Sequence, residues 1–210
     1  MTVAAALTLA VVAALDWVAV QRRRARVEQV AKPLVMVALA WLALTMGAAD
    51  DEVGRLLLVA LAFSAVGDIF LLGSSMVDFS GGLASFLVAH VAFVLAFLTL
   101  GFHPGWALIG LLVAMSLGLT SGRRVVRAAA RQGGAAPGGG VTAYIVIAAS
   151  MVVAASGTAR PLVLLGALVF LFSDTVLALD RFVGPRANAR LLVIVTYHLA
   201  QVLMVVGALR

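Results

Sequence analysis

The sequence predicts an all-α protein that crosses a membrane about eight times, and three observations support this prediction. Of its 210 residues, 64% are hydrophobic and 11% are charged, against about 45–50% and 25% in soluble domains. The apolar residues form segments of about 15–20 residues, the length that an α-helix needs to cross the hydrocarbon core. The charged residues gather between these segments. Because backbone groups in lipid must pair within their own segment, we expect helices.

The predicted spans follow the hydropathy of the chain in order. They cover residues 2–20, 33–49, 55–73, 82–101, 104–121, 141–157, 161–180 and 190–209. The first apolar run lacks the positively charged lead of a cleavable signal peptide and is itself followed by arginines, so we expect it to be the first span.

The basic residues favour one orientation of these spans. Of the 15 lysines and arginines, 12 fall in predicted loops on one side of the membrane, and Lys32 is one of these 12. The exceptions are Arg55, Arg160 and Arg210. The positive-inside rule then predicts an inner-membrane protein with the basic loops in the cytoplasm and both termini outside. The net charge of +6 follows from this topology, and no soluble basic domain is predicted, so we expect no nucleic-acid partner. The absence of cysteine excludes disulfides and thiolate metal ligands.

We expect residues 1–210 to form a single integral membrane domain. Within it, a flexible Gly-rich cytoplasmic loop over 122–140 is predicted to join two halves, 1–121 and 141–210. No separate soluble domain and no protein partner are predicted.

Two acids stand in apolar runs, Asp68 in "FSAVGDIFLL" and Asp174 in "VFLFSDTVLAL". Each is followed in the next span by a histidine, His90 after 22 residues and His198 after 24. This repeated order of an acid and a histidine favours an internal duplication, in which two sets of four spans have the same orientation. An acid inside a membrane is costly and usually faces protein or water, so a functional role is the default hypothesis. The structural alternative is an acid that pins two helices through hydrogen bonds.

The predicted topology places several polar residues at one depth. Asp68 and Asp174 lie a few residues before the cytoplasmic ends of their helices, and His90, Tyr197 and His198 lie a few residues after such ends, roughly 8–13 Å inside the boundary at 1.5 Å per residue. Other polar residues near this layer are predicted to bind substrate: Ser64, Ser173, His198, Gln201 and Arg181. Gln201 shares a helix face with Tyr197 and His198. Arg181 follows Asp174 by seven residues at the headgroup level, where a guanidinium suits a lipid phosphate.

Four pieces of the chain, "FSAVGDIFLL", "FSGGLASFLVAHVAFVLAF", "LVFLFSDTVLALDRF" and "TYHLAQVLMVVG", together resemble the YhhN-like family of membrane proteins. Animal members of that family are lysoplasmalogenases. With the eight-span hydropathy, the resemblance covers most of residues 55–208, and the first two spans match only as apolar helices.

The resemblance implies hydrolysis of the vinyl ether bond of a lysoplasmalogen, a lysophospholipid, to a fatty aldehyde and glycerophosphoethanolamine or glycerophosphocholine. The paired acids of the family fall on Asp68 and Asp174, and two further motif positions fall on His90 and Tyr197. His198 stands where an aromatic neighbour is expected. No cofactor and no metal are implied.

The chemistry of a vinyl ether suits a pair of acids. Hydrolysis begins with protonation of the β-carbon, and a protonated carboxyl in a medium of low dielectric constant is a suitable donor. A second, ionised carboxylate stabilises the resulting cation and activates water, as in glycoside hydrolysis. The apolar neighbours of Asp174 favour it as the donor and Asp68 as the base, with His90 and Tyr197 orienting the water or the ether oxygen.

Two other classes of function stay open from the residues alone. The first is a metal-dependent lipid hydrolase in which His90, His198 and an aspartate hold zinc. The chain has no HxxxH or HExxH spacing to support it. The second is a proton-coupled transporter of a small molecule or lipid, since buried acids also serve ion movement. Activity that survives chelation argues against the first, and proton uptake without product formation favours the second.

Overall fold

The structure, a computed structural model, describes residues 1–133 and 135–210. Its regular elements are all helical, and no strand occurs in the part of the chain that it describes. Eight helices among the described residues are long and apolar enough to cross a membrane. The predicted all-α fold with eight spans is therefore confirmed, and the protein is an integral membrane protein.

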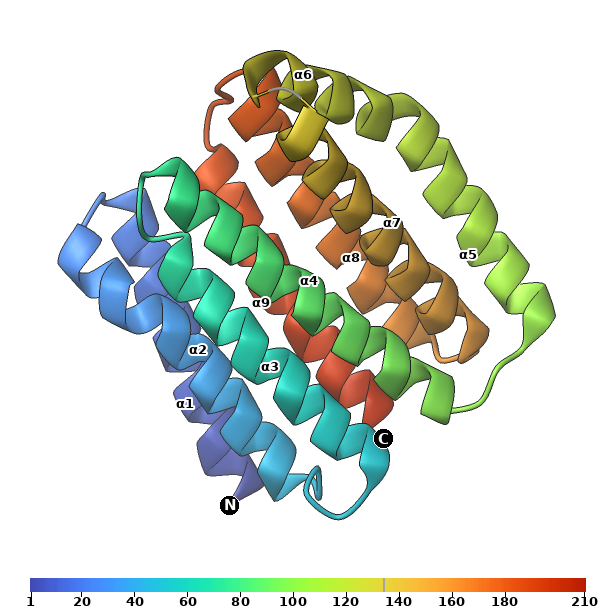
Figure 1. The fold of residues 1–210 in the computed structure, drawn as a ribbon. Helices are drawn as coiled ribbons and strands as arrows, with labels where there is room; N and C mark the ends of the chain where they lie inside the picture. The colour runs from blue at the N-terminus through green and yellow to red at the C-terminus, as the bar shows by residue number, and fades with distance from the viewer. Residues whose placement is uncertain (134) are drawn as a thin grey trace. The chain divides into compact units, whose positions relative to one another are not determined.

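The chain divides into two compact units. Figure 1 labels the helices of both along the chain. Unit 1 comprises Met1–Leu100 together with Ala208–Arg210, and unit 2 comprises Gly101–Gly207. Each unit carries four of the eight spanning helices. The division falls after the fourth span, ahead of the 122–140 segment that we predicted would join two halves; the assignment of two halves and of a duplication stays a prediction.

Unit 1 contains α1 (Thr2–Gln21), α2 (Ala25–Thr45), α3 (Glu52–Phe70) and α4 (Met76–Thr99). Helix α1 packs on α2, α2 on α3, and α3 most extensively on α4. Two acidic residues, Asp51 and Asp78, cap the starts of α3 and α4. The Asp51 carboxylate accepts a hydrogen bond from the backbone N–H of Gly54 at 2.7 Å, and Ser75 and Asp78 form a capping box at the start of α4.

Helix α2 begins at Ala25, well ahead of residue 33, where we predicted the second span to start. The predicted start followed hydropathy, which is low over the charged residues before Pro33. In the structure Pro33 lies inside α2. Prolines are tolerated inside membrane helices because neighbouring groups satisfy the freed carbonyl. As a consequence, Lys32 is a helix residue, and its prediction as a loop residue was wrong.

Unit 2 contains α5 (Pro104–Leu117), α6 (Arg123–Gly133), α7 (Ala135–Gly157), α8 (Pro161–Ala178) and α9 (Ala189–Ala208). Two short π-helical segments, η1 (Gly118–Gly122) and η2 (Leu179–Val183), follow α5 and α8. Helix α5 packs on α7, and α6 packs on both α7 and η2. Pro104 and Pro161 stand at the first positions of α5 and α8, where their missing N–H groups cost nothing.

The segment 122–140, predicted to be a Gly-rich loop, is helical where the structure describes it; Gly134 lies outside the described residues. The run "RRVVRAAARQ" is rich in alanine and arginine, which are strong helix formers. It forms α6, which buries Val125 and Ala129 and exposes its arginines. Gly138, Gly139 and Gly140 belong to α7, since glycine is frequent in membrane helices.

Candidate functional site

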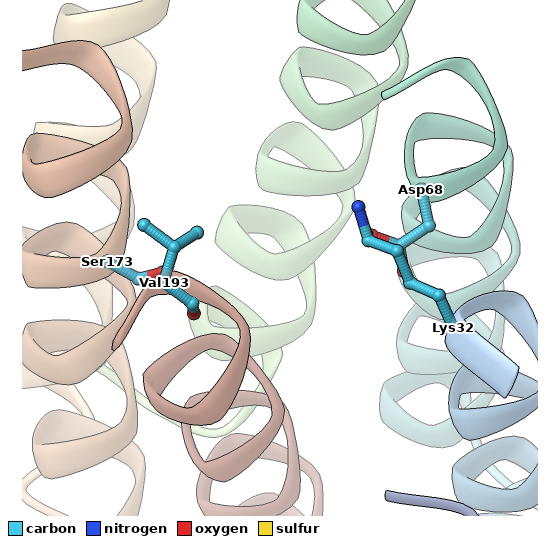
Figure 2. Close-up of polar contacts among 4 residues, drawn as sticks. All are labelled: Lys32, Asp68, Ser173 and Val193. Carbon is cyan, nitrogen blue, oxygen red and sulfur yellow. Dashed lines mark hydrogen bonds and ion pairs between the residues drawn. The ribbon is translucent and has the colours of Figure 1, made fainter. Parts of the chain in front are cut away.

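In unit 1, Asp68 lies near the end of α3 and is 1% exposed. Its Oδ1 is 3.5 Å from Nζ of Lys32, whose side chain is 11% exposed (Figure 2). The two residues come from adjacent, packed helices, α3 and α2. Burial of a single charge costs several kcal/mol, and a partner of opposite charge offsets part of that cost. Asp68, which the sequence singled out, therefore forms a buried ion pair with Lys32. The sequence analysis did not predict a functional role for Lys32.

His90 also lies in unit 1, on α4, and is 1% exposed. Its Nδ1 is 2.6 Å from the carbonyl oxygen of Phe86. A carbonyl only accepts, so Nδ1 carries the proton, and a neutral ring then presents Nε2 as an acceptor. The side chain of Phe86 packs close to Gly67, where an added Cβ would lie 2.7 Å from the ring. Gly67 thus allows α4 to approach α3 beside Asp68.

Further polar residues of unit 1 are buried at the same end of the helices. Ser64 is fully buried one turn before Asp68 on α3. Glu28 is 7% exposed and lies one turn before Lys32 on α2, so the two share a helix face. Asp16, on α1, is fully buried as well. Unit 1 therefore holds several buried ionisable groups, which come from different helices.

In unit 2, Asp174 lies on α8 and is partly buried. Its Oδ2 accepts a hydrogen bond from the hydroxyl of Tyr144, on α7, at 2.8 Å. The sequence analysis did not single out Tyr144. A signal was present, since the chain has only two tyrosines and Tyr144 lies in an apolar run.

Four other predicted site residues of unit 2 point into the protein. Tyr197, His198 and Gln201 on α9 and Ser173 on α8 are each at most 5% exposed. The ring of Tyr197 packs edge-on against Phe170, with centroids 5.5 Å apart, and against His198 at 5.4 Å. The Ser173 hydroxyl donates to the carbonyl of Val193 at 2.9 Å (Figure 2). Ser173 thus links α8 to α9.

Arg181 is exposed in η2, beyond the end of α8. The next residue, Phe182, is 7% exposed, and its carbonyl accepts a hydrogen bond from Nε2 of Gln132 at 2.9 Å. This bond ties basic helix α6 to the segment that carries Arg181, and both belong to unit 2.

Asp68, Ser64 and His90 belong to unit 1, whereas Asp174, Ser173, Arg181, Tyr197, His198 and Gln201 belong to unit 2. The geometry above is that of each unit by itself, and the single layer that we predicted for these residues stays a prediction. Among the described residues, no group of three or more His, Asp or Glu side chains gathers in a way that could hold a metal ion. The metal-dependent alternative thus gains no ligand set from the described part of the chain.

Comparison with known proteins bears on the predicted resemblance. The family described as the YhhN family matches residues 27–208. The chain belongs to the YhhN family. The match begins within α2, so it includes Lys32 as well as both acids, and it reaches further toward the N-terminus than the residue motifs did.

Several relatives in the YhhN family are similar to this chain over most of its length. Human lysoplasmalogenase TMEM86B is 36% identical over 156 residues, which are 74% of this chain and 64% of the relative. Bovine lysoplasmalogenase TMEM86A is 30% identical over 162 residues, 71% of this chain and 63% of the relative. The chain thus spans a little under two thirds of the length of these relatives. No solved structure matches it.

Proposed function

We propose that the protein is a membrane-embedded hydrolase that cleaves the vinyl ether bond of lysoplasmalogens. The products are a fatty aldehyde and glycerophosphoethanolamine or glycerophosphocholine. One observation carries the proposal: the YhhN family match runs through both intramembrane acids, and the relatives are named lysoplasmalogenases.

The reaction consumes one water and needs a proton donor. Protonation of the β-carbon of the vinyl ether gives an oxocarbenium ion, and water adds to its carbon to give a hemiacetal. Loss of the glycerol oxygen as an alcohol then releases the aldehyde, and the proton gained from water restores the donor. The barrier lies in the first step, so a general acid is the group that the enzyme most needs.

We assign the proton transfer to Asp174 and the stabilisation of the cation to Asp68. The contacts of the two carboxyl groups support this division. Asp68 faces an ammonium, Lys32, which suits a group that acts as an anion. Asp174 is bonded through Oδ2 to a neutral hydroxyl, Tyr144, which fixes its orientation and is compatible with a proton on Oδ1. Two acids in different environments can divide the two roles.

The other predicted residues orient water and substrate. His90 holds its ring through Nδ1, and an accepting Nε2 suits a water that attacks the cation. We propose that Tyr197 contacts the ether oxygen, and that Ser64, Ser173, His198 and Gln201 line the path of the substrate. Arg181 is exposed at the end of its helix, where it is suited to bind the lipid phosphate.

The orientation of the protein belongs to the same proposal. The basic segments lie in the cytoplasm and both termini lie outside, because arginine and lysine are retained on the cytoplasmic side of membrane proteins. Asp174 stands near the end of α8, which leads into the arginine-containing segment 179–190. Asp68 stands near the end of α3 and beside Lys32, at the end of α2 that follows the arginines 22–24. The substrate would then be a lysolipid of the inner leaflet.

The test is release of fatty aldehyde from lysoplasmenylethanolamine and lysoplasmenylcholine by the purified protein in detergent. We expect wild type to release aldehyde with or without a chelator. Asp68→Asn and Asp174→Asn should each fold and lose activity by about 100-fold or more, the usual effect of removing an acid or base. Asp50→Asn, an exposed acid between α2 and α3, is the matched control and should behave as wild type.

Three results would count against the proposal. Folded wild type that releases no aldehyde from either lipid overturns the activity. Loss of activity on chelation favours the metal-dependent alternative. If the Asn variants lose stability and keep the wild-type rate of aldehyde release, the acids serve to hold helices together and not to catalyse.

A further inference from the structure

The ammonium of Lys32 is buried beside the acid that the proposed reaction uses as an anion. We propose that Lys32 is a positioning residue, whose charge keeps the Asp68 carboxylate ionised and in place during catalysis. This inference rests on the proposed function and adds a residue to it from α2, a helix in which the sequence motifs marked no functional position.

The burial of Lys32 separates it from the other basic residues at this end of α2. Lysines near the ends of membrane helices ordinarily extend toward the interface and keep the charge in water. The nearby Arg26 is exposed in this way. The Lys32 side chain is instead 11% exposed with its Nζ turned to Asp68, and its neighbours on the buried face of α2 include Val35, Met36 and Leu39. The positive-inside bias does not account for a charge that is held inside the protein.

The distance indicates what the pair contributes. Charge-assisted N–H···O bonds are about 2.7–2.9 Å long, whereas the Nζ–Oδ1 distance is 3.5 Å. The interaction is therefore mainly Coulombic, and Coulomb attraction is strong where the dielectric constant is low. A second cation of similar reach should replace lysine, and a neutral side chain of similar length should not.

The reaction explains why such a pair is useful. The oxocarbenium ion is positive, so an anion beside it lowers the barrier only if the anion persists in a membrane interior. A lone buried carboxylate is costly there. Lys32 reduces that cost before substrate arrives. Because Lys32 acts through Asp68, its loss should lower kcat and leave KM nearly unchanged, since no contact with the substrate is removed.

The experiment compares Lys32→Met, which removes the charge, with Lys32→Arg, which keeps it. Aldehyde release and thermal unfolding in detergent are measured for both and for wild type. We expect Lys32→Met to lose at least tenfold in kcat with KM within twofold, and Lys32→Arg to recover most of the rate. Arg26→Gln, which removes an exposed charge from the same helix, is the control and should match wild type. If Lys32→Met does not fold, Lys32→Gln replaces it, because its amide can still donate to Asp68 without a charge.

A double-variant cycle tests the pair independently of substrate. Removal of one partner leaves a buried charge uncompensated, so Lys32→Met combined with Asp68→Asn should unfold at a higher temperature than either single variant. Equal activity of Lys32→Met and wild type, or equal loss in the methionine and arginine variants, overturns the positioning role. Additive stabilities overturn the ion pair itself. Failure of wild type to release aldehyde is a different result, because it overturns the proposed function and leaves the stability cycle to report on the pair.

Discussion

The Tyr144 hydroxyl donates a hydrogen bond to Oδ2 of Asp174 at 2.8 Å, whereas Nζ of Lys32 lies 3.5 Å from Oδ1 of Asp68. The first contact is a directional hydrogen bond from a neutral group, and the second is an attraction between charges. A hydrogen bond fixes where a carboxyl oxygen points, and this matters most for an acid that must deliver a proton to one carbon atom. The two acids should therefore respond differently to the loss of their partners.

Replacement of Tyr144 by phenylalanine removes the hydroxyl and keeps the ring. A hydrogen bond between neutral groups contributes about 0.5–1.5 kcal/mol, so we expect aldehyde release by Tyr144→Phe to fall about two- to tenfold, chiefly in kcat. Steady-state kinetics measure the effect. Thr142→Val is the control, because the Thr142 hydroxyl bonds within α7 to the carbonyl of Gly138. A Tyr144→Phe protein as fast as wild type would show that this bond does not orient the acid for catalysis.

Much of the polar interior could be predicted at this scale from the sequence. Asp68, His90 and Tyr197 are polar residues within apolar runs, and such residues must face protein or water; all three are buried. Lys32 and Tyr144 were missed for different reasons. Lys32 stands in a basic stretch, and the positive-inside rule explained its charge as that of a cytoplasmic loop. The structure instead pairs it with Asp68. Tyr144 follows a Gly-rich stretch, and its partner Asp174 lies 30 residues further along the chain. Pairing of that kind comes from tertiary packing and not from local pattern.

At the scale of the helix, hydropathy located the spans and misplaced several ends. The apolar core of a span sets its hydropathy, but the helix itself continues while backbone bonds and helix-forming residues allow it. Helix α2 thus starts at Ala25 and α7 at Ala135, both ahead of their predicted spans. The same reason explains α6, whose arginines and alanines favour a helix although no apolar window marks it.

Close packing of α5 on α7 depends on a small residue at position 110. A Cβ on Gly110 would lie 2.7 Å from Cβ of Ser156 and 3.1 Å from the carbonyl oxygen of Val152. The Ser156 hydroxyl also donates to the carbonyl of Trp106 at 2.6 Å, so the two helices are tied at this point. Small residues allow such approach between membrane helices.

We expect Gly110→Ala to destabilise the protein by about 1–3 kcal/mol, the usual cost of overpacking. The measurement is the thermal unfolding midpoint in detergent. Gly105→Ala, on the same helix, is the matched control, because a Cβ there meets nothing within 4 Å. It should be neutral or slightly stabilising, since alanine favours a helix over glycine. Equal midpoints for the two variants would mean that α5 and α7 can separate at Gly110 at no cost.

For the whole molecule, the sequence predicted the number of spans, and the structure has eight such helices among the described residues. Composition determines this property, because lipid accepts few alternatives to apolar helices. The two halves joined by 122–140 stay a prediction, and the two compact units of the structure meet along the chain between Leu100 and Gly101. Such units depend on which helices pack together, and local composition does not encode that packing.

The orientation of the protein in the membrane can be tested directly, because the chain has no cysteine. A single introduced cysteine therefore reports on one position. Arg127→Cys lies on the exposed face of α6, and Asp50→Cys lies in the exposed connection between α2 and α3. An impermeant maleimide is applied to cells that express each variant, before and after permeabilisation.

We expect Asp50→Cys to be labelled in intact cells and Arg127→Cys only after permeabilisation, because the positive-inside rule keeps the arginines of α6 in the cytoplasm. The result decides which leaflet supplies the substrate. Asp174 lies near the end of α8 that leads into the arginines of 179–190, and Asp68 lies beside Lys32 near the arginines that precede α2. In the expected orientation, both acids would be reached from the inner leaflet. The reverse labelling pattern would place those helix ends at the outer leaflet. The protein would then act on lysolipids of the outer leaflet, and a lysolipid of the inner leaflet would have to cross the bilayer before hydrolysis.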